Sequence, residues 1–198
     1  KGNVYPVNPN RKKVQGVKSY SSVTQIKEEV DLAVIAVPAR ITPQVIEECG
    51  QKGIAACIVI SAGFKETGEQ GKKLEGQIKQ IIAKYKMRLM GPNCLGVINT
   101  RNNLNASFAP QMPKKGRTVV LSQSGAVGSA IIEWSSEQNV GIEVFVSMGS
   151  MLDIGFADLI EYFGKKSDIN GIIIYMESVK DAKRFMEVAK EVVLKKPI

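Results

Sequence analysis

Short runs of β-branched and other apolar residues alternate with longer helix-patterned segments, and this alternation constrains the fold more than any other feature of the chain. In the first half, apolar runs at 30–39, 54–64 and 87–91 are separated by helix-patterned segments at 42–52 and 69–85. Near-continuous apolar runs are typical of strands that are buried on both faces of a parallel sheet. Strands and helices that alternate at these spacings predict a doubly wound α/β unit.

The pattern restarts after the linker-like sequence "MPKKGR" at 112–117. The preceding segment, 95–113, is rich in Asn and Pro, so we expect a hairpin with loops and short edge strands there. The segment 118–138 then predicts a strand, a Gly–Ser turn at 122–125 and a helix. Further strands are predicted at 141–149 and 171–178, and helices follow them at 156–163 and 181–194. The sequence therefore predicts two consecutive doubly wound parallel-sheet units of α/β class, at 1–115 and 116–198.

Both ends of the sequence resemble cuts through a longer protein. Lys1 stands directly before a predicted strand at 3–9, and "KKPI" at 195–198 resembles the start of another strand. A doubly wound domain normally has one more strand and helix ahead of this point, and a phosphate-binding glycine loop lies in its first turn. We therefore expect that the first strand–helix unit of the first domain and the C-terminal part of the second are missing.

Several function classes are disfavoured by composition. The chain has no histidine, which is the commonest general base and metal ligand, so a cysteine nucleophile and a metal site are not expected. The odd number of cysteines and the lack of a signal peptide favour a reducing, cytoplasmic location. The net charge of +8 comes mostly from lysines scattered over predicted helix faces, so neither a nucleic acid nor a membrane is an expected partner.

Three turns of the first unit lie where a parallel sheet binds its ligands, at the carboxyl ends of the strands. They are "AVPARIT", "ISAGF" and "GPNC", and all three are small or contain glycine, so backbone amides can approach a ligand closely. Gly and Pro also end strands without binding anything. Three such turns in register nevertheless favour a binding site.

The turn "LSQSGAVGSA" of the second unit joins a strand to a helix. Ser124 is a good N-cap, and the free amides after it, beginning at Gly125, would offer a phosphate site at the positive end of the helix. The alternative is an ordinary capped turn. Glu177 ends the last strand at the same edge, where it could orient a partner side chain or simply be solvated. The turn matches neither a P-loop nor a nucleophile elbow, since no lysine follows the glycine and no histidine completes a triad.

Taken in order and spacing, "VYPVNP", "VDLAVIAVPA", "IVISAGF", "GPNCLGVIN", "LNASFAP" and "LSQSGAVGSA" resemble the α subunits of ADP-forming acyl-CoA synthetases, such as acetate–CoA ligase, which are similar to those of succinyl-CoA synthetase. The resemblance covers nearly the whole chain. It implies a CoA-binding Rossmann-like domain at 1–115 and a flavodoxin-like ligase domain at 116–198. Acyl-CoA, ADP and phosphate would give acid, ATP and CoA through an acyl phosphate and a phosphohistidine.

The resemblance also implies ligands, partners and site residues. Coenzyme A would bind this chain, and ADP or ATP with Mg would bind an ATP-grasp β subunit or fused domain, in an oligomer. Residues that resemble the CoA-binding turns are Val37, Pro38, Ala39, Ser61, Ala62, Gly63, Asn93 and Cys94, with Cys94 as a wall of the thioester pocket. Residues that resemble the phosphoryl-binding helix terminus are Ser122, Ser124 and Gly125. Glu177 resembles the carboxylate that orients the phosphorylated histidine.

Three departures from the family accompany this resemblance. The glycine-rich loop would precede Lys1, the histidine would follow Ile198, and Ser150 stands where asparagine is usual. The isolated chain is therefore expected to be inactive. Two alternatives stay open: a non-catalytic CoA-binding regulatory module, for example one linked to an acyltransferase, and an NAD-binding Rossmann protein. The latter is disfavoured because there is no G-x-G-x-x-G and no acidic residue after the 3–9 strand.

Overall fold

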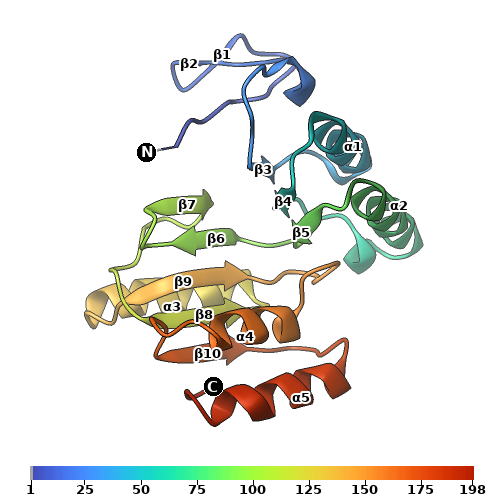
Figure 1. The fold of residues 1–198 in the computed structure, drawn as a ribbon. Coiled ribbons are helices and arrows are strands. Elements are labelled where there is room, and N and C mark those ends of the chain that lie inside the picture. Colours follow the sequence, from blue (N-terminus) through green and yellow to red (C-terminus); the bar gives the residue numbers. More distant parts are fainter. Residues whose placement is uncertain (1) are drawn as a thin grey trace. The chain divides into compact units, whose positions relative to one another are not determined.

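The computed structural model describes residues 2–198, and it divides into two compact units (Figure 1). The first unit holds the chain up to residue 57 and residues 63–89, and the second holds 58–62 and 90–198. The elements of the N-terminal half are β1 (Lys13–Val14), β2 (Val17–Lys18), β3 (Leu32–Ile35), α1 (Thr42–Lys52), β4 (Ala56–Val59), α2 (Glu69–Tyr85) and β5 (Arg88–Met90). Single turns of 3₁₀ helix lie at Val23–Gln25, Ala39–Ile41 and Lys65–Thr67. Strands β3, β4 and β5 form one three-stranded sheet in that order.

The two helices predicted in the N-terminal half are confirmed, and each begins and ends at the predicted residues. The bounds of α1 and α2 are the predicted ones because each segment carries an apolar stripe at helical spacing. Ile46 and Ile78 belong to these stripes, and both are completely buried. Lys, Glu and Gln fill the opposite faces.

Two predictions for the N-terminal strands are wrong. The 3–9 segment forms no strand, and only Val7 makes an isolated bridge, to Tyr20. Pro6 and Pro9 contribute no backbone N–H donor, so a regular ladder cannot continue through this segment. The 30–39 strand is shorter than predicted and is not buried on both faces, since Val34 is 47% exposed.

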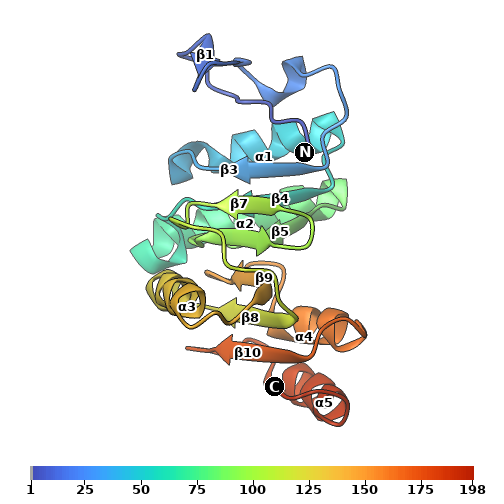
Figure 2. The ribbon, with the colours of Figure 1, turned by 90° about the vertical axis from the view of Figure 1, so that its left-hand side faces the viewer.

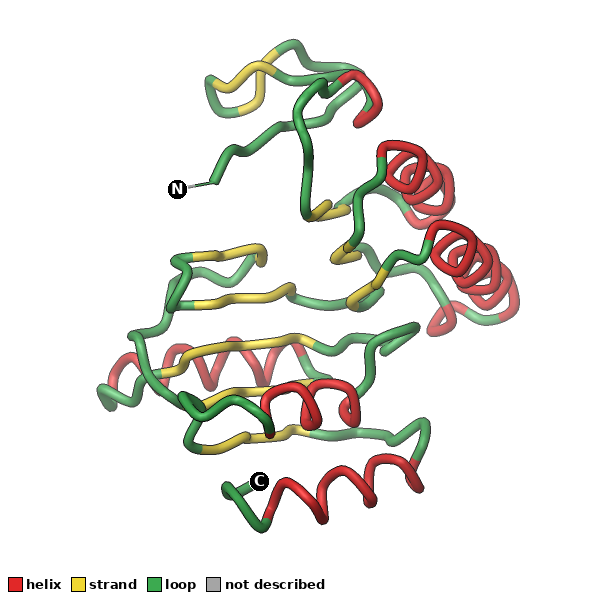
Figure 3. The backbone as a smooth tube through the Cα atoms, in the orientation of Figure 1, coloured by secondary structure: helices red, strands yellow, loops and turns green. Residues whose placement is uncertain are grey.

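The second unit contains a mixed five-stranded sheet in the order β10-β8-β9-β6-β7. Its elements are β6 (Gly96–Asn99), β7 (Leu104–Ser107), β8 (Thr118–Ser122), α3 (Gly125–Glu137), β9 (Ile142–Ser147), α4 (Phe156–Gly164), β10 (Gly171–Tyr175) and α5 (Ala182–Val193). Strand β8 pairs in parallel with both β9 and β10, as predicted. Helix α3 covers one face of this sheet, whereas α4 and α5 cover the other (Figures 2 and 3).

The core of this sheet is built mainly from apolar residues of β8 and β9. Every residue of β9 is buried, which agrees with the near-continuous apolar run in the sequence. One cluster packs between the sheet and α3, and it consists of Leu95, Ile98, Val120, Ile132, Ile142 and Phe145. This cluster includes residues of β8 and β9, the two strands that are followed by the turn before α3 and by the loop at 147–152.

The predicted hairpin at 95–113 is confirmed as β6 and β7, which pair antiparallel. Strand β6 also pairs antiparallel with β9, so the hairpin extends the sheet of the second unit. The domain boundary near residue 115 stays a prediction. Within residues 2–198, no helix is both long enough and apolar enough to span a membrane.

Candidate functional site

The turn between β8 and α3 is held by the side chains of its own serines. Ser124 is the N-cap of α3, and its Oγ accepts a hydrogen bond from the Val127 amide at 3.2 Å, as predicted. Ser122 is completely buried, and its hydroxyl donates to the Ser124 carbonyl at 2.7 Å. The hydroxyl of Ser122 therefore stabilises the turn. The amide groups of Gly125 and of the next residue begin the helix, where an α-helix has no internal acceptor for them.

Gln123, in the same turn, joins α3 to the segment that follows β10. Its Oε1 accepts hydrogen bonds from the amides of Glu177 at 2.6 Å and Ser178 at 2.8 Å. Its Nε2 donates to the Ser178 hydroxyl at 3.1 Å, and its own amide donates to the Tyr175 carbonyl at 3.0 Å. The backbone of Glu177, whose side chain is exposed, is thus bonded to the turn that precedes α3, and Glu177 lies two residues after the end of β10.

A loop at 147–152 connects this turn to the "GPNC" turn. The Met148 amide donates to the Ser122 carbonyl at 2.7 Å, which places the start of the loop against the end of β8. Two residues later, the Ser150 amide donates to the Pro92 carbonyl at 2.8 Å. A chain of backbone hydrogen bonds therefore connects the turn that holds Asn93 and Cys94 with the turn that holds Ser124 and Gly125.

Gly149 makes the close approach of the two loops possible. Its φ is +53°, and a Cβ at this position would lie 2.2 Å from the Pro92 carbonyl oxygen and 2.6 Å from that of Asn93. Only a residue without a side chain fits between these backbones. The Leu152 amide adds a further bond, to the Gly91 carbonyl at 2.9 Å.

Cys94 is buried in this setting. Its thiol donates to the Val59 carbonyl at 3.3 Å, and only 4% of the residue is exposed. Burial raises the pKa of Cys94 to about 12, so the thiol stays protonated at neutral pH. The expectation that Cys94 lines a pocket and is not a nucleophile stays a prediction. Asn93, by contrast, is exposed, with a φ of +56°.

The other predicted CoA-binding residues lie in turns that meet in pairs. In the first unit, a Cβ on Gly63 would lie 3.0 Å from the Cβ of Ala39. Gly63 therefore lies next to the turn at 37–39. In the second unit, the Asn93 amide donates to the Ser61 carbonyl at 2.9 Å. The strands before these turns, β3, β4 and β5, are neighbours in one sheet.

Two parts of this site escaped the sequence analysis. Gln123 was read only as part of a glycine–serine turn, and its bonds to residues more than fifty positions away have no local signal. The loop at 147–152 had one available signal, because "SMGSML" places a glycine between two buried methionines directly after a strand.

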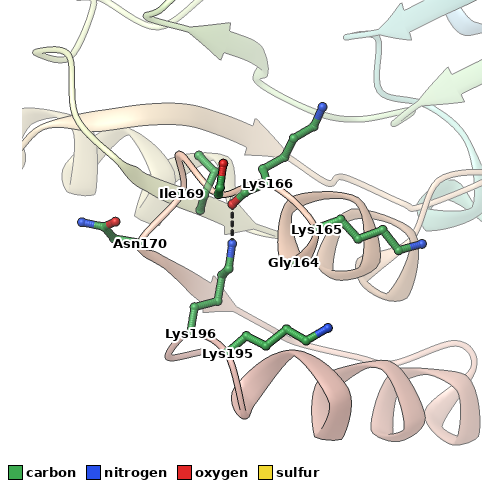
Figure 4. Close-up of a pocket in the computed structure, with 8 residues that line it drawn as sticks. Gly164, Lys165, Lys166, Ile169, Asn170, Lys195 and Lys196 are labelled. Carbon is green, nitrogen blue, oxygen red and sulfur yellow. Dashed lines mark hydrogen bonds between the residues drawn. The ribbon is translucent and has the colours of Figure 1, made fainter.

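A separate cavity of about 360 Å³ lies near the C-terminal end of α4 (Figure 4). It is lined by Gly164, Lys165, Lys166, Ser167, Ile169, Asn170, Lys195 and Lys196. Lys196 is only 9% exposed, and its ammonium donates to the carbonyls of Phe163 at 3.0 Å and Lys166 at 2.6 Å. Its charge therefore has a local structural function at the end of the helix.

Comparisons with known proteins assign both halves of the sequence. Residues 1–100 match the family model of a CoA binding domain, and residues 115–198 match that of a succinyl-CoA ligase like flavodoxin domain. The chain is 48% identical to the alpha subunit of acetate–CoA ligase [ADP-forming] II of Pyrococcus furiosus, over all of this chain and 43% of that protein. It is 39% identical to 4-hydroxybutyrate–CoA ligase [ADP-forming] of Nitrosopumilus maritimus, over all of this chain and 29% of that protein.

Solved structures agree with these relatives. A crystal structure from Pyrococcus horikoshii OT3 superimposes with a TM-score of 0.96 at 46% identity, over all of this chain and 45% of that one. Acetyl-coenzyme A synthetase 1 of Ca. Korarchaeum cryptofilum, solved in complex with phosphate and ADP, gives a TM-score of 0.94 at 38% identity, over all of this chain and 43% of that one. The chain thus spans less than half the length of these relatives. It belongs to the CoA binding domain family and is similar over its whole length to the alpha part of the ADP-forming acetate–CoA ligases.

Proposed function

We propose that this chain is the CoA-binding and phosphoryl-transfer alpha portion of an ADP-forming acyl-CoA synthetase. In this reaction phosphate displaces CoA from an acyl-CoA to give an acyl phosphate, which passes its phosphoryl group to a histidine and leaves as the free acid. ADP then takes the phosphoryl group to form ATP. Because this chain contains no histidine, that residue must come from the rest of the ligase.

One observation carries the proposal. Backbone hydrogen bonds through the loop at 147–152 join the turn assigned to the thioester, at Asn93 and Cys94, to the turn assigned to the phosphoryl group, at Ser124 and Gly125. Attack of phosphate on a thioester requires both groups to be held close together. A route of direct backbone contacts between the two turns supports that requirement.

We assign CoA to the turns that end β3, β4 and β5. These are Val37-Pro38-Ala39, Ser61-Ala62-Gly63 and Asn93-Cys94, of which the second and third contribute backbone groups that bond to each other. The exposed Asn93 side chain would reach the thioester, whereas Cys94 would form part of the wall behind it.

We assign the phosphoryl group to the N-terminal end of α3. The amides that follow Ser124 and the dipole of this thirteen-residue helix both favour an anion there. Glu177, fixed beside this helix end, would accept a hydrogen bond from the histidine and orient it. ADP or ATP with Mg would bind an ATP-grasp subunit or fused domain in a cytoplasmic oligomer, and the similarity to alpha subunits supports such a partner.

Calorimetric titration with CoA tests the first assignment. We expect heat with CoA and none with NADH, and we expect Asn93→Gly to weaken CoA binding because it removes the side chain but retains the positive φ. Asn103→Gly is the matched control, since Asn103 is also exposed and also has a positive φ, of +52°. Binding of NADH without CoA, or equal CoA affinity in both variants and the wild type, would contradict the assignment.

A further inference from the structure

Gln123 makes more contacts across the site than any other polar side chain of its turn. Its amide group bonds to both Glu177 and Ser178, and its backbone bonds to Tyr175. One residue of the β8–α3 turn thus binds three of the four residues from 175 to 178. The other site residues of that turn, Ser122 and Ser124, bond within the turn itself.

The orientation of the Gln123 amide follows from its partners. Two backbone N–H groups point at one atom of it, at 2.6 and 2.8 Å, and N–H groups can only donate. That atom must therefore be the oxygen. The amide nitrogen is then directed at the Ser178 hydroxyl, which can accept.

These bonds bear on Glu177 in particular. Its carboxylate is exposed, so no packing of the side chain fixes its position. The backbone of Glu177 is fixed instead, because its amide donates to Gln123 and the next amide does so as well. Without the Gln123 oxygen, two adjacent amides would lose their acceptor, and residues 177 and 178 would be held less firmly beside the start of α3.

We infer that Gln123 is a positioning residue of the phosphoryl-transfer step, which keeps Glu177 beside the N-terminal end of α3. This inference rests on the proposed function, in which Glu177 orients the phosphorylated histidine. The side chain of Gln123 acts through the backbone of Glu177 and does not itself contact the transferred group. Loss of its oxygen slows phosphoryl transfer and leaves CoA binding unchanged.

The experiment uses the full-length ligase with its ATP-grasp part. We would measure kcat, KM for the acyl-CoA and the rate at which ATP gives acid-labile phosphoprotein. Gln123→Leu and Gln123→Asn each remove the acceptor, the second because its side chain is one methylene shorter. Both should lower kcat and the phosphorylation rate by about tenfold to a hundredfold, as misplacement of a reacting group does. KM for the acyl-CoA should stay within about twofold of the wild-type value. The reason is that the hydrogen bonds lost with the Gln123 oxygen take no part in binding the acyl-CoA.

One variant is a control for the mechanism. Ser178→Ala removes only the partner of the amide nitrogen and should resemble the wild type. Melting temperatures of all variants separate a loss of fold from a loss of positioning.

The outcomes distinguish this inference from the proposed function. If the wild-type ligase forms no acid-labile phosphoprotein, both the proposed function and this inference are wrong. If the wild type is phosphorylated and Glu177→Gln is impaired, but Gln123→Leu and Gln123→Asn keep the wild-type kcat, only this inference is wrong. It is also wrong if these two variants raise KM with kcat unchanged.

Discussion

Replacement of Gly149 by alanine tests the junction between the two candidate turns. The new Cβ would lie 2.2 Å from the Pro92 carbonyl oxygen, and real Cβ atoms essentially never approach closer than 3.0 Å, so the loop must move by at least 0.8 Å. Such a shift would lengthen the Ser150–Pro92 and Leu152–Gly91 hydrogen bonds, which are 2.8 and 2.9 Å long. Each bond contributes about 1 kcal/mol, and a left-handed backbone costs alanine about 1 kcal/mol.

We therefore expect Gly149→Ala to lower the free energy of unfolding by about 3 kcal/mol. The assay is urea unfolding followed by the fluorescence of Trp134, the single tryptophan, which lies in the same unit. With an m value of about 2 kcal/mol per molar, the midpoint should fall by about 1.5 M.

Gly125→Ala is the matched control for this experiment. Its Cβ would lie 3.9 Å from Leu95, an ordinary contact, and Gly125 is the first residue of a helix, where alanine is favourable. We expect its midpoint to equal or exceed that of the wild type. A change of less than about 0.5 kcal/mol in Gly149→Ala, within the range of ordinary surface substitutions, would refute the argument that the 147–152 loop is clamped against the "GPNC" turn.

Three further predictions concern stability and reactivity. Ser147→Ala removes the buried hydroxyl that accepts from the Leu95 amide at 2.8 Å, so the free energy of unfolding in urea should fall by about 1–3 kcal/mol. Lys196→Met removes the two hydrogen bonds that the ammonium donates to the Phe163 and Lys166 carbonyls and should cost about 2 kcal/mol in the same assay, whereas Lys196→Arg should cost less. Cys94 should resist iodoacetamide at pH 8.5 until the protein unfolds, as mass spectrometry of the labelled peptide would show. The folded Cys94 has a pKa of about 12, whereas an unfolded thiol ionises near 9. The contribution of Cys94 to the free energy of unfolding is therefore complete below pH 9 and falls as the pH rises to 12. In a Cys94→Ala variant, the free energy of unfolding should fall less steeply over this pH range.

The sequence predicted what depends on local periodicity. Helices α1 and α2 have the expected bounds because their apolar stripes are properties of contiguous residues. The strand at 3–9 failed because a strand also needs a partner, and only Val7 has one. Similarly, the pairing of β6 with β9 joins segments about fifty residues apart, and no local pattern specifies it.

The candidate site divides in the same way. Ser124 was predictable as an N-cap because capping is a local preference for serine before a helix. Gln123 was not, since its function in the structure depends on amides 54 and 55 residues further along the chain. The loop at 147–152 is intermediate: its glycine marks an unusual backbone, but the carbonyls it approaches belong to another segment.

The burial of Cys94 is compatible with the chemistry that we propose for its neighbourhood. A thiolate beside an acyl-CoA would attack the thioester carbonyl and take the acyl group from CoA, in competition with phosphate. Burial against the Val59 carbonyl keeps the thiol protonated, and the chain offers no histidine that could remove its proton. The same turn also presents Asn93, a neutral amide that can donate hydrogen bonds to a thioester without attacking it. A turn with one exposed amide and one buried, neutral thiol is therefore suited to hold a thioester while another nucleophile reacts with it.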